Sequence, residues 1–497
     1  MHPLEEEEQT RIVEPCILVI FGATGDLTSR KIVPALYNLL HDGQLPSLFA
    51  CIGFARRPKT HDQFREEMKD AVSKYSRNKP IEESLWNHFK DHLFYHVSEF
   101  HEDAGYEKLK KLLQELDAKL GTKGNRIFYL ATPPSYFPLI CQKLHSSGLI
   151  YDDNQVKDKW SRVIIEKPFG HDLTSAQALQ KELLHCLSEK QIYRIDHYLG
   201  KETVQNLLVF RFANSIFESL WNHHYIDHLQ ITVAEDMGIG TRGKFYEEAG
   251  LLRDIVQNHM MQLLSLVAME PPVTLEADAI RDEKVKVIES IRPLQKSDVV
   301  RGQYGPGLVN GTEVVGYRQE KDVSPQSSVE TYLALKLHID NKRWSGVPFY
   351  LRAGKRLPKR TTEIAVIFKA PPSVLFQKAQ IPNVLVIRIQ PDEGSSLKIN
   401  CKVPGPSSPI QPVKMDFRYG AYFGTTPPEA YERLICDCIL GDSTLFARQD
   451  EVLQSWKIFT PLLEMGPEPF PNYAAGSWGP SAADQLIEES GRKWRLI

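Results

Sequence analysis

Residues 16–27 read CILVIFGATGDL, and this stretch decides the fold of the N-terminal part of the 497-residue chain. Its first six residues are all apolar, which is typical of a strand buried on both faces of a parallel sheet. The turn from Gly22 to Leu27 lies where a helix is expected to begin, and backbone amides at such a position can bind a phosphate group. The spacing departs from the usual three-glycine pattern, so the turn alone is equally compatible with an ordinary tight turn.

Helices and strands alternate along the chain after this turn. Apolar residues recur at helical spacing from Ile32 to Leu40, and Asp42-Gly43 supplies a stop. The next elements are expected to be a strand at 48–54, helices at 64–75 and 106–120, and strands at 127–131 and 163–166. This order predicts an N-terminal α/β domain over residues 1–195 with a Rossmann-like, doubly wound sheet.

The pattern changes after Tyr198, where long strand-like segments follow one another without alternating helices. They cover residues 228–234, 332–339, 363–368 and 384–390. This succession predicts a large, mainly antiparallel sheet, and a long helical pattern at 250–269 is expected to pack against it. We therefore expect residues 196–497 to form a second, α+β domain.

The composition excludes several classes of protein. A hydrophobic share of 42%, a charged share of 25% and a net charge of -3 are ordinary for a globular protein and argue against nucleic acid or acidic membrane surfaces as partners. No secretory signal or bilayer-spanning segment is visible, so a cytoplasmic protein is expected. The seven cysteines form neither a disulfide framework nor a zinc pattern, and no metal site is expected.

A basic pair follows the second expected strand, in the sequence Gly53-Phe54-Ala55-Arg56-Arg57. NAD-binding domains usually place an acidic residue there for the ribose hydroxyls. Arginine instead suits the 2′-phosphate of NADP, because a guanidinium forms two parallel hydrogen bonds with phosphate oxygens. The position of Arg56 after the glycine turn therefore favours NADP and leaves exclusive or dual cofactor use as alternatives.

Lys167 follows another buried strand, in the segment IIEKPFG at residues 164–170. Ligands bind beyond the carboxyl ends of strands in open parallel sheets. Lys167 is therefore a candidate contact for a cofactor phosphate or for the substrate. Its alternative role is that of an ordinary surface lysine at the end of a strand.

Residues 194–202, RIDHYLGKE, concentrate charged side chains and a histidine in a region that otherwise reads as buried. If this stretch is helical, His197 and Lys201 share a face, and two donors there can bind a phosphate dianion. A solvated helix face explains the same spacing equally well.

His259 lies on an apolar stripe of the long helical pattern, together with Leu252, Ile255 and Leu263. A histidine in this setting is more often a hydrogen-bonded core residue than a catalyst. Asp196 offers a carboxylate that would hold one ring nitrogen and raise the basicity of the other. Spacing alone does not decide between these two roles.

Taken together, these motifs resemble those of the glucose-6-phosphate dehydrogenase family. Residues 194–202 are similar to its substrate signature, which is highly specific. The resemblance covers nearly the whole chain in the expected order, and its other motifs are Gly22-Ala23-Thr24-Gly25-Asp26-Leu27, Glu166-Lys167-Pro168-Phe169-Gly170, Arg253-Asp254 with Gln257-Asn258-His259, and Arg352-Ala353-Gly354-Lys355.

The resemblance implies a role for each matching residue. His259 is the implied proton acceptor and Asp196 its orienting carboxylate. The implied substrate-binding residues are His197, Tyr198, Lys201, Glu235, Asp254, Lys355, Arg360 and Lys167. The implied cofactor-binding residues are Gly22, Ala23, Thr24, Gly25, Asp26, Leu27, Arg56 and Lys167. The basic run at 355–360 leaves open which of its cations touches the substrate.

The activity implied by the resemblance is oxidation of glucose 6-phosphate to a 6-phosphoglucono-lactone with hydride transfer to NADP. This reaction is the first step of the oxidative pentose phosphate pathway in glucose metabolism. Homodimers or homotetramers are implied by analogy. The alternatives are a related dehydrogenase acting on an unphosphorylated sugar and a non-catalytic NADP-sensing protein.

Overall fold

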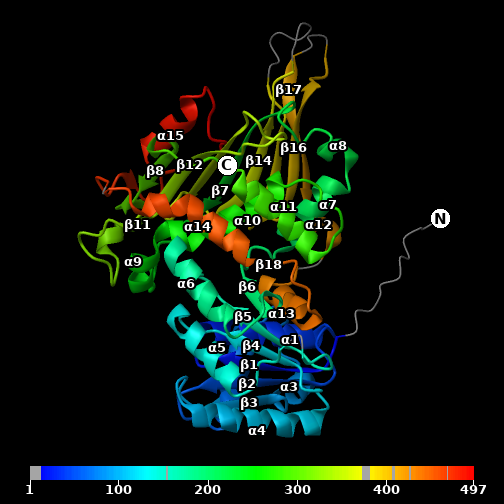
Figure 1. Ribbon diagram of the computed structural model, residues 1–497. Helices are drawn as coiled ribbons and strands as arrows, with labels where there is room; N and C mark the ends of the chain where they lie inside the picture. The colour runs from blue at the N-terminus through cyan, green and yellow to red at the C-terminus, as the bar shows by residue number, and fades with distance from the viewer. Residues whose placement is uncertain (1–12, 153–154, 372–380, 406–408, 425–426, 467) are drawn as a thin grey trace, which may run out of the picture. The chain divides into compact units, whose positions relative to one another are not determined.

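The computed structural model describes residues 13–152, 155–371, 381–405, 409–424, 427–466 and 468–497 (Figure 1). The chain forms two compact units. The first unit holds the described residues up to Gly200, together with Leu275–Arg281 and Pro428–Val452. The second unit holds Lys201–Thr274 and the described residues of Asp282–Pro427 and Leu453–Ile497. The chain therefore leaves the first unit and later returns to it.

The first unit is built on a sheet of seven strands in the order β18-β6-β5-β4-β1-β2-β3. All pairs are parallel except the pair of β18 with β6. The strands are β1 (Cys16–Phe21), β2 (Phe49–Ala55), β3 (Leu93–Val97), β4 (Arg126–Leu130), β5 (Ser161–Ile165), β6 (Ile192–Ile195) and β18 (Phe446–Ala447). This confirms the predicted Rossmann-like sheet, although the sequence did not indicate β3, β6 or β18.

Helices connect these strands and bury their apolar faces on the sheet. The helical elements are η1 (Thr28–Ile32), α1 (Val33–His41), α2 (His61–Tyr75), α3 (Glu83–Lys90), α4 (Asp103–Leu120), α5 (Phe137–Ser146), α6 (Leu173–Leu184) and α13 (Ala430–Leu440). One core layer joins Phe21 of β1 and Phe54 of β2 to Tyr106 and Leu113 of α4 and to Phe137 of α5. Burial of such large apolar side chains is the main stabilising contribution to a sheet of this kind.

Residues Pro428–Val452, which return to the first unit, are attached to it by side-chain contacts of α13 and by the pairing of β18 with β6. Glu432 on α13 is buried and accepts a hydrogen bond from Asn38 of α1 at 2.8 Å and from Arg77 at 3.0 Å. Lys31 pairs with Glu429 at 2.6 Å. Because α1 and the glycine turn belong to one connection, residues far away in the sequence help to hold that connection in place.

The second unit contains a sheet of eight strands in the order β17-β16-β15-β14-β7-β13-β12-β8. Its neighbours are antiparallel except for β7 and β13, which run parallel. The strands are β7 (Ile226–Ala234), β8 (Val299–Gly302), β12 (Tyr332–His338), β13 (Pro348–Gly354), β14 (Thr361–Phe368), β15 (Val384–Gln390), β16 (Gly394–Lys402) and β17 (Ile410–Arg418). The predicted large antiparallel sheet is confirmed.

The helical pattern at 250–269 is not one α-helix. Helix α9 (Gly243–Leu251) is interrupted at Gly250, whose φ is 61°. The π-helix η4 (Leu252–Met260) and helix α10 (Met261–Ala268) then follow. The apolar spacing predicted a helix here but did not indicate the wider winding, in which hydrogen bonds span five residues instead of four.

Further elements complete the second unit. They are α7 (Glu202–Phe212), α8 (Ser215–Glu218), α12 (Tyr419–Phe423), α15 (Ser481–Glu488) and two small sheets formed by β9 (Tyr304–Gly305) with β19 (Tyr473–Ala474) and by β10 (Gly307–Val309) with β11 (Thr312–Val314). Helices α11 (Ala277–Glu289) and α14 (Gln449–Leu463) each have residues in both units.

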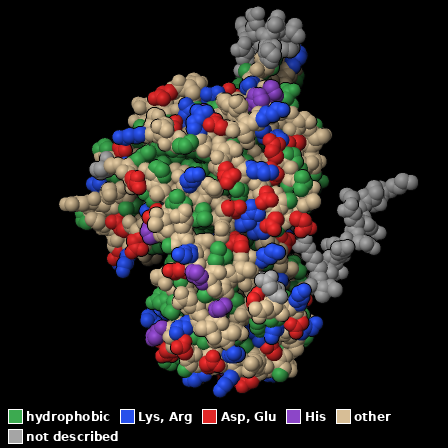
Figure 2. All heavy atoms as spheres, viewed as in Figure 1, with side chains coloured by type: hydrophobic (Ala, Val, Ile, Leu, Met, Phe, Trp, Pro, Cys, Tyr) green, Lys and Arg blue, Asp and Glu red, His purple; other side chains and the backbone are tan. Residues whose placement is uncertain are grey.

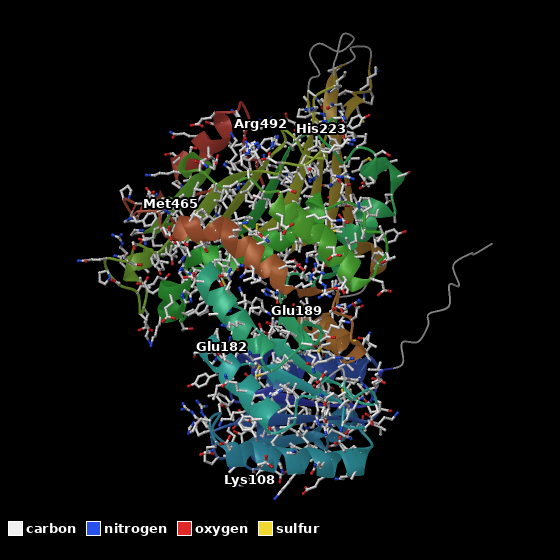
Figure 3. All side chains as sticks on the ribbon, viewed as in Figure 1. Lys108, Glu182, Glu189, His223, Met465 and Arg492 are labelled. Carbon is white, nitrogen blue, oxygen red and sulfur yellow. The ribbon has the colours of Figure 1, made fainter. Side chains whose placement is uncertain are left out.

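Near the C-terminus, Arg492 (Figure 3) donates to Asp227 through two nitrogens at 2.8 and 3.0 Å.

Basic and acidic side chains are interspersed over the visible face of the protein (Figure 2), in keeping with the small net charge of -3. Within the described residues, every helix is too short or too polar to cross a bilayer.

Candidate functional site

The turn between β1 and η1, predicted to bind a phosphate group, packs tightly against the sheet. Gly22 has a φ of 85°, and a Cβ atom at this position would lie 2.3 Å from the carbonyl oxygen of Ala131, which follows β4. The amide of Gly22 donates to Phe54 O near the end of β2 at 3.0 Å. The turn is therefore held at the carboxyl edge of the parallel sheet, and Gly25 and Asp26 remain exposed there. Ligands bind at this edge in doubly wound folds.

Substituting Gly22 tests how much the turn depends on glycine. We expect Gly22→Ala to lower the free energy of unfolding by more than about 1 kcal/mol, because alanine is strained at this φ and its methyl group would overlap a backbone oxygen. Denaturant unfolding measures the loss. Gly43→Ala is the matched control, because Gly43 has a φ of 68° and no heavy atom within 4 Å of its added Cβ. Equal losses in the two variants would contradict the close approach at Gly22.

Arg56 and Arg57 follow β2 and are exposed at the same edge of the sheet as the turn. The loop is anchored because the Tyr95 hydroxyl donates to Arg57 O at 2.7 Å. Arg56 follows strand β2. The Phe54 carbonyl of the same strand accepts the hydrogen bond from the Gly22 amide, so Arg56 and the glycine turn lie near each other. This placement fits the predicted contact with a ribose 2′-phosphate.

Lys167 follows β5, and its neighbour Glu166 is bonded from two directions. The Tyr129 hydroxyl of β4 donates to Glu166 at 2.6 Å, and Tyr431 of α13 also hydrogen bonds to this carboxylate. Burial raises the pKa of Glu166, and the two tyrosines act in the opposite direction. The residue that precedes Lys167 is therefore held in place by hydrogen bonds from β4 and α13. The sequence did not indicate the two tyrosines.

Residues 196–201 form turns after β6, and α7 begins only at Glu202, so the helical explanation for the spacing of His197 and Lys201 is wrong. Asp196 is 3% exposed, and its side chain accepts a hydrogen bond from the amide of Tyr198 at 3.0 Å. This bond favours a turn over a helix. The His197 ring lies parallel to the Tyr431 ring, with centroids 6.4 Å apart.

Three predicted substrate residues of the second unit meet in one charged cluster. Glu235 follows β7 and Lys355 follows β13, and these parallel strands pair Ala234 with Gly354. Lys355 is 5% exposed, and its Nζ binds the Glu235 carboxylate and lies 3.6 Å from Asp254. Opposite charges held together inside a protein compensate each other's desolvation. A sugar hydroxyl would find acceptors and a donor side by side in this cluster.

Two further predicted cations lie near the ends of neighbouring strands in the second unit. Arg360 is exposed and directly precedes Thr361, the β14 residue that pairs with Ala234. Lys201 donates to the Gln390 side chain of β15 at 2.5 Å, and Gln390 in turn donates to Thr362 at 3.1 Å. Gln390 is a candidate functional residue that the sequence analysis missed, because only the sheet brings it to Lys201.

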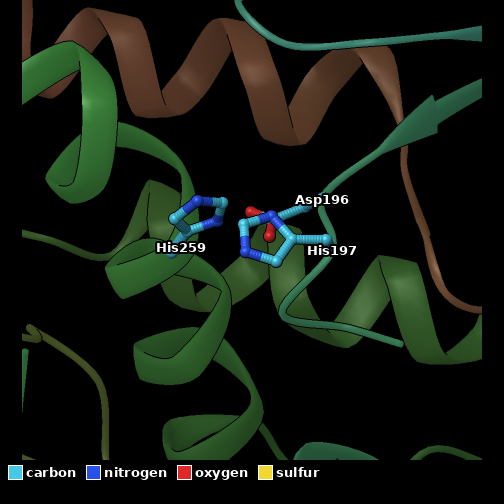
Figure 4. A group of neighbouring side chains, drawn as sticks. All are labelled: Asp196, His197 and His259. Atoms are coloured by element: carbon cyan, nitrogen blue, oxygen red, sulfur yellow. The ribbon is translucent and has the colours of Figure 1, made fainter. Parts of the chain in front are cut away.

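His259 lies on the π-helix η4 and is 1% exposed. Figure 4 shows His259 on its helix and Asp196 and His197 on the segment that follows strand β6. Because a π-helix closes each hydrogen-bonded turn over five residues, Asp254 and His259 come to one side of η4. An α-helix would turn them well apart. The π-helix therefore places the candidate base on the side that carries Asp254.

Comparisons with known proteins cover both units. Residues 19–206 match the family model "Glucose-6-phosphate dehydrogenase, NAD binding domain", and residues 208–495 match "Glucose-6-phosphate dehydrogenase, C-terminal domain". The match of residues 19–206 therefore assigns a nucleotide-binding domain to the first unit.

Curated relatives and solved structures agree with these matches. "Glucose-6-phosphate 1-dehydrogenase" of Chlamydia muridarum is 56% identical over 490 residues, 97% of either chain. "Glucose-6-phosphate 1-dehydrogenase" of Bacillus subtilis is 45% identical over 488 residues, 96% of this chain and 98% of the relative. A solved "Glucose-6-phosphate dehydrogenase in complex with its substrate glucose-6-phosphate" superposes with a TM-score of 0.90 at 38% identity, covering 98% of this chain and 99% of that structure. The chain therefore belongs to the glucose-6-phosphate dehydrogenase family of oxidoreductases.

Proposed function

We propose that the protein oxidises glucose 6-phosphate to a 6-phosphoglucono-lactone and transfers the hydride to NADP, as in the first step of the oxidative pentose phosphate pathway. The observation that carries this proposal is the charged cluster of Glu235, Asp254 and Lys355, of which Asp254 lies on the helix of His259, in a chain similar throughout to a structure solved with glucose 6-phosphate. We assign nucleotide binding to residues 1–195 and substrate binding, catalysis and oligomerisation to residues 196–497.

The residues of the first unit fit NADP. Glycine at position 22 lets the turn of residues 22–27 pack against Ala131, and the exposed Gly25 and Asp26 lie just before the helical segment, where a phosphate group would bind. Arg56 is exposed beyond the neighbouring strand, where its guanidinium would pair with a 2′-phosphate. Lys167 lies at the end of β5, and we assign it a contact with the cofactor or the sugar. NADP, when bound, supplies the hydride acceptor.

The chain itself supplies proton transfer and orientation. His259 accepts the proton of the anomeric hydroxyl while the anomeric hydrogen leaves as hydride, and Asp196 orients the imidazole. A positioned base contributes about two to four powers of ten in rate. His197, Tyr198 and Lys201 bind the phosphate group of the sugar, and this remote binding holds the anomeric carbon in place.

The sugar ring is held by the second unit. Glu235 and Asp254 accept hydrogen bonds from its hydroxyls, and Lys355 and Arg360 add donors. Lys355 already holds the two carboxylates in place before substrate arrives, and Arg242 supplies a second positive charge beside Asp254, so little reorganisation is needed on binding.

One assay separates this function from its alternatives. NADPH absorbance is followed with glucose 6-phosphate, with glucose and with neither. We expect rapid NADPH formation with glucose 6-phosphate, and little or none with glucose or without a sugar. Equal rates with glucose would support a dehydrogenase of unphosphorylated sugars, and no turnover with either sugar would support an NADP-sensing protein.

We also propose that the protein acts in the cytoplasm as a homodimer or homotetramer. Large apolar side chains are exposed on β17 and α12, at the edge of the eight-stranded sheet, and Met415 and Tyr422 are 58% and 76% exposed. Such exposure at a sheet edge favours association. Analytical ultracentrifugation distinguishes the two assemblies.

A further inference from the structure

Glu330, which lies just before β12, binds the start of the helix that carries His259. Its carbonyl oxygen accepts a hydrogen bond from Leu251 N at 3.2 Å, and its side-chain Oε1 accepts one from Leu252 N at 3.0 Å. The first amides of a helix have no partner within the helix. A carboxylate at this position also interacts favourably with the helix dipole. Glu330 therefore caps η4 with both its backbone and its side chain.

The next residue, Thr331, binds the segment that carries Lys355. Its carbonyl oxygen accepts a hydrogen bond from Lys355 N at 3.0 Å. Thr331 is fully buried, and its hydroxyl accepts a hydrogen bond from Tyr304 N at 3.0 Å. Two adjacent residues thus hold two different elements, namely the helix of Asp254 and His259 and the turn after β13.

The surroundings leave Glu330 little freedom. A Cβ atom on Gly250 would lie 2.6 Å from Glu330 Oε1. The Tyr246 hydroxyl donates to Glu330 O at 3.5 Å, and the ring of the same tyrosine lies 5.2 Å from Lys355 Nζ. Glu330 keeps part of its surface exposed, but burial of its carboxyl group raises its pKa, while the bond from the Leu252 amide lowers it.

We propose that Glu330 is a positioning residue that keeps Asp254 and His259 at a fixed spacing from Lys355. Asp254 is only two residues beyond Leu252, and its carboxylate lies 3.6 Å from Lys355 Nζ and 3.2 Å from an Arg242 nitrogen. A shift at the start of η4 moves this carboxylate directly. This inference rests on the proposed function, because it assigns the cap a role in aligning the base and the sugar-binding residues.

Three variants and a control test the cap. We expect Glu330→Ala to lower kcat about tenfold to a hundredfold, because small displacements of reacting groups are costly. Gly250→Ala displaces the carboxylate without removing it and should lower kcat in the same direction. Glu330→Gln should restore most of the activity, since its amide oxygen still accepts the Leu252 bond. NADP binding, assigned to the first unit, should be unchanged in all three.

The control is Glu247→Ala. Glu247 lies on α9 and accepts hydrogen bonds from Tyr317 and Ser327 at 2.6 Å each, so its loss removes a comparable carboxylate from the same unit. We expect the control to lose thermal stability and keep kcat. A similar fall of kcat in Glu247→Ala and Glu330→Ala, or wild-type kcat in folded Glu330→Ala, would overturn the proposal.

Hydrogen exchange gives a readout that does not depend on the reaction. Amides of residues 251–260 should exchange faster in Glu330→Ala than in the wild type, in Glu330→Gln or in the control. Wild-type exchange in Glu330→Ala would reject the cap, even if the wild-type protein fails to oxidise glucose 6-phosphate. That failure would instead reject the proposed function, so the two outcomes are distinguishable.

Discussion

His259→Asn is expected to lower turnover about a hundredfold to ten-thousandfold, the range contributed by a positioned general base. Asparagine keeps a polar side chain of similar reach but has no basic ring nitrogen to accept the proton of the anomeric hydroxyl. Because the phosphate and most sugar hydroxyls are assigned to other residues, the affinity for glucose 6-phosphate should change little. Steady-state kinetics and titration with glucose 6-phosphate measure the two quantities separately.

The control for this substitution is His228→Asn. His228 is also buried in the second unit, 5% exposed on β7, and it pairs with Asp227 at 2.6 Å. It has no role in the proposed chemistry, so its loss should change stability and leave kcat near the wild-type value. Wild-type turnover in His259→Asn would show that the base lies elsewhere.

Arg56→Ala should weaken NADP binding by roughly 30- to 150-fold, which corresponds to about 2–3 kcal/mol of lost charge-assisted hydrogen bonds. NAD lacks the 2′-phosphate, so its binding should change far less. Dissociation constants for both cofactors, measured by fluorescence titration, test the difference.

Lys59→Ala is the matched control for Arg56→Ala. It removes one positive charge from the same loop, but Lys59 pairs with Glu67 on α2. We expect this variant to affect the two cofactors equally and weakly. If Arg56→Ala weakens NAD as strongly as NADP, Arg56 does not select the cofactor.

The nucleotide-binding half was predictable because its signals are local. The apolar run of β1, the glycine turn and Arg56 lie within about forty residues, and each contributes to one strand-helix-strand connection. The antiparallel sheet was also predictable, since its strands β7, β12, β14 and β15 are long and apolar. The roles of single residues in the sugar site came from the family motif, because spacing left His259 and the pair of His197 and Lys201 ambiguous.

The remaining features depend on contacts between distant parts of the chain. Gln390 meets Lys201, and Tyr431 meets Glu166, only after the sheets have formed. The π-helix was missed because apolar spacing predicts a helix without revealing how tightly it is wound. Its start is held by Glu330, a residue 78 positions away from Leu252. The residues around Leu252 therefore do not predict this hydrogen bond.

The return of residues 428–452 to the first unit has a consequence during protein synthesis. When the ribosome has made Gly200, β6 is complete but its partner β18 is still about 250 residues from being translated. At about 5–20 residues per second, the nascent chain carries this open strand edge for tens of seconds. Unpaired edges invite pairing with other chains. We therefore expect a fragment that ends before α13 to leave the edge of β6 unpaired and to aggregate more readily than the full chain.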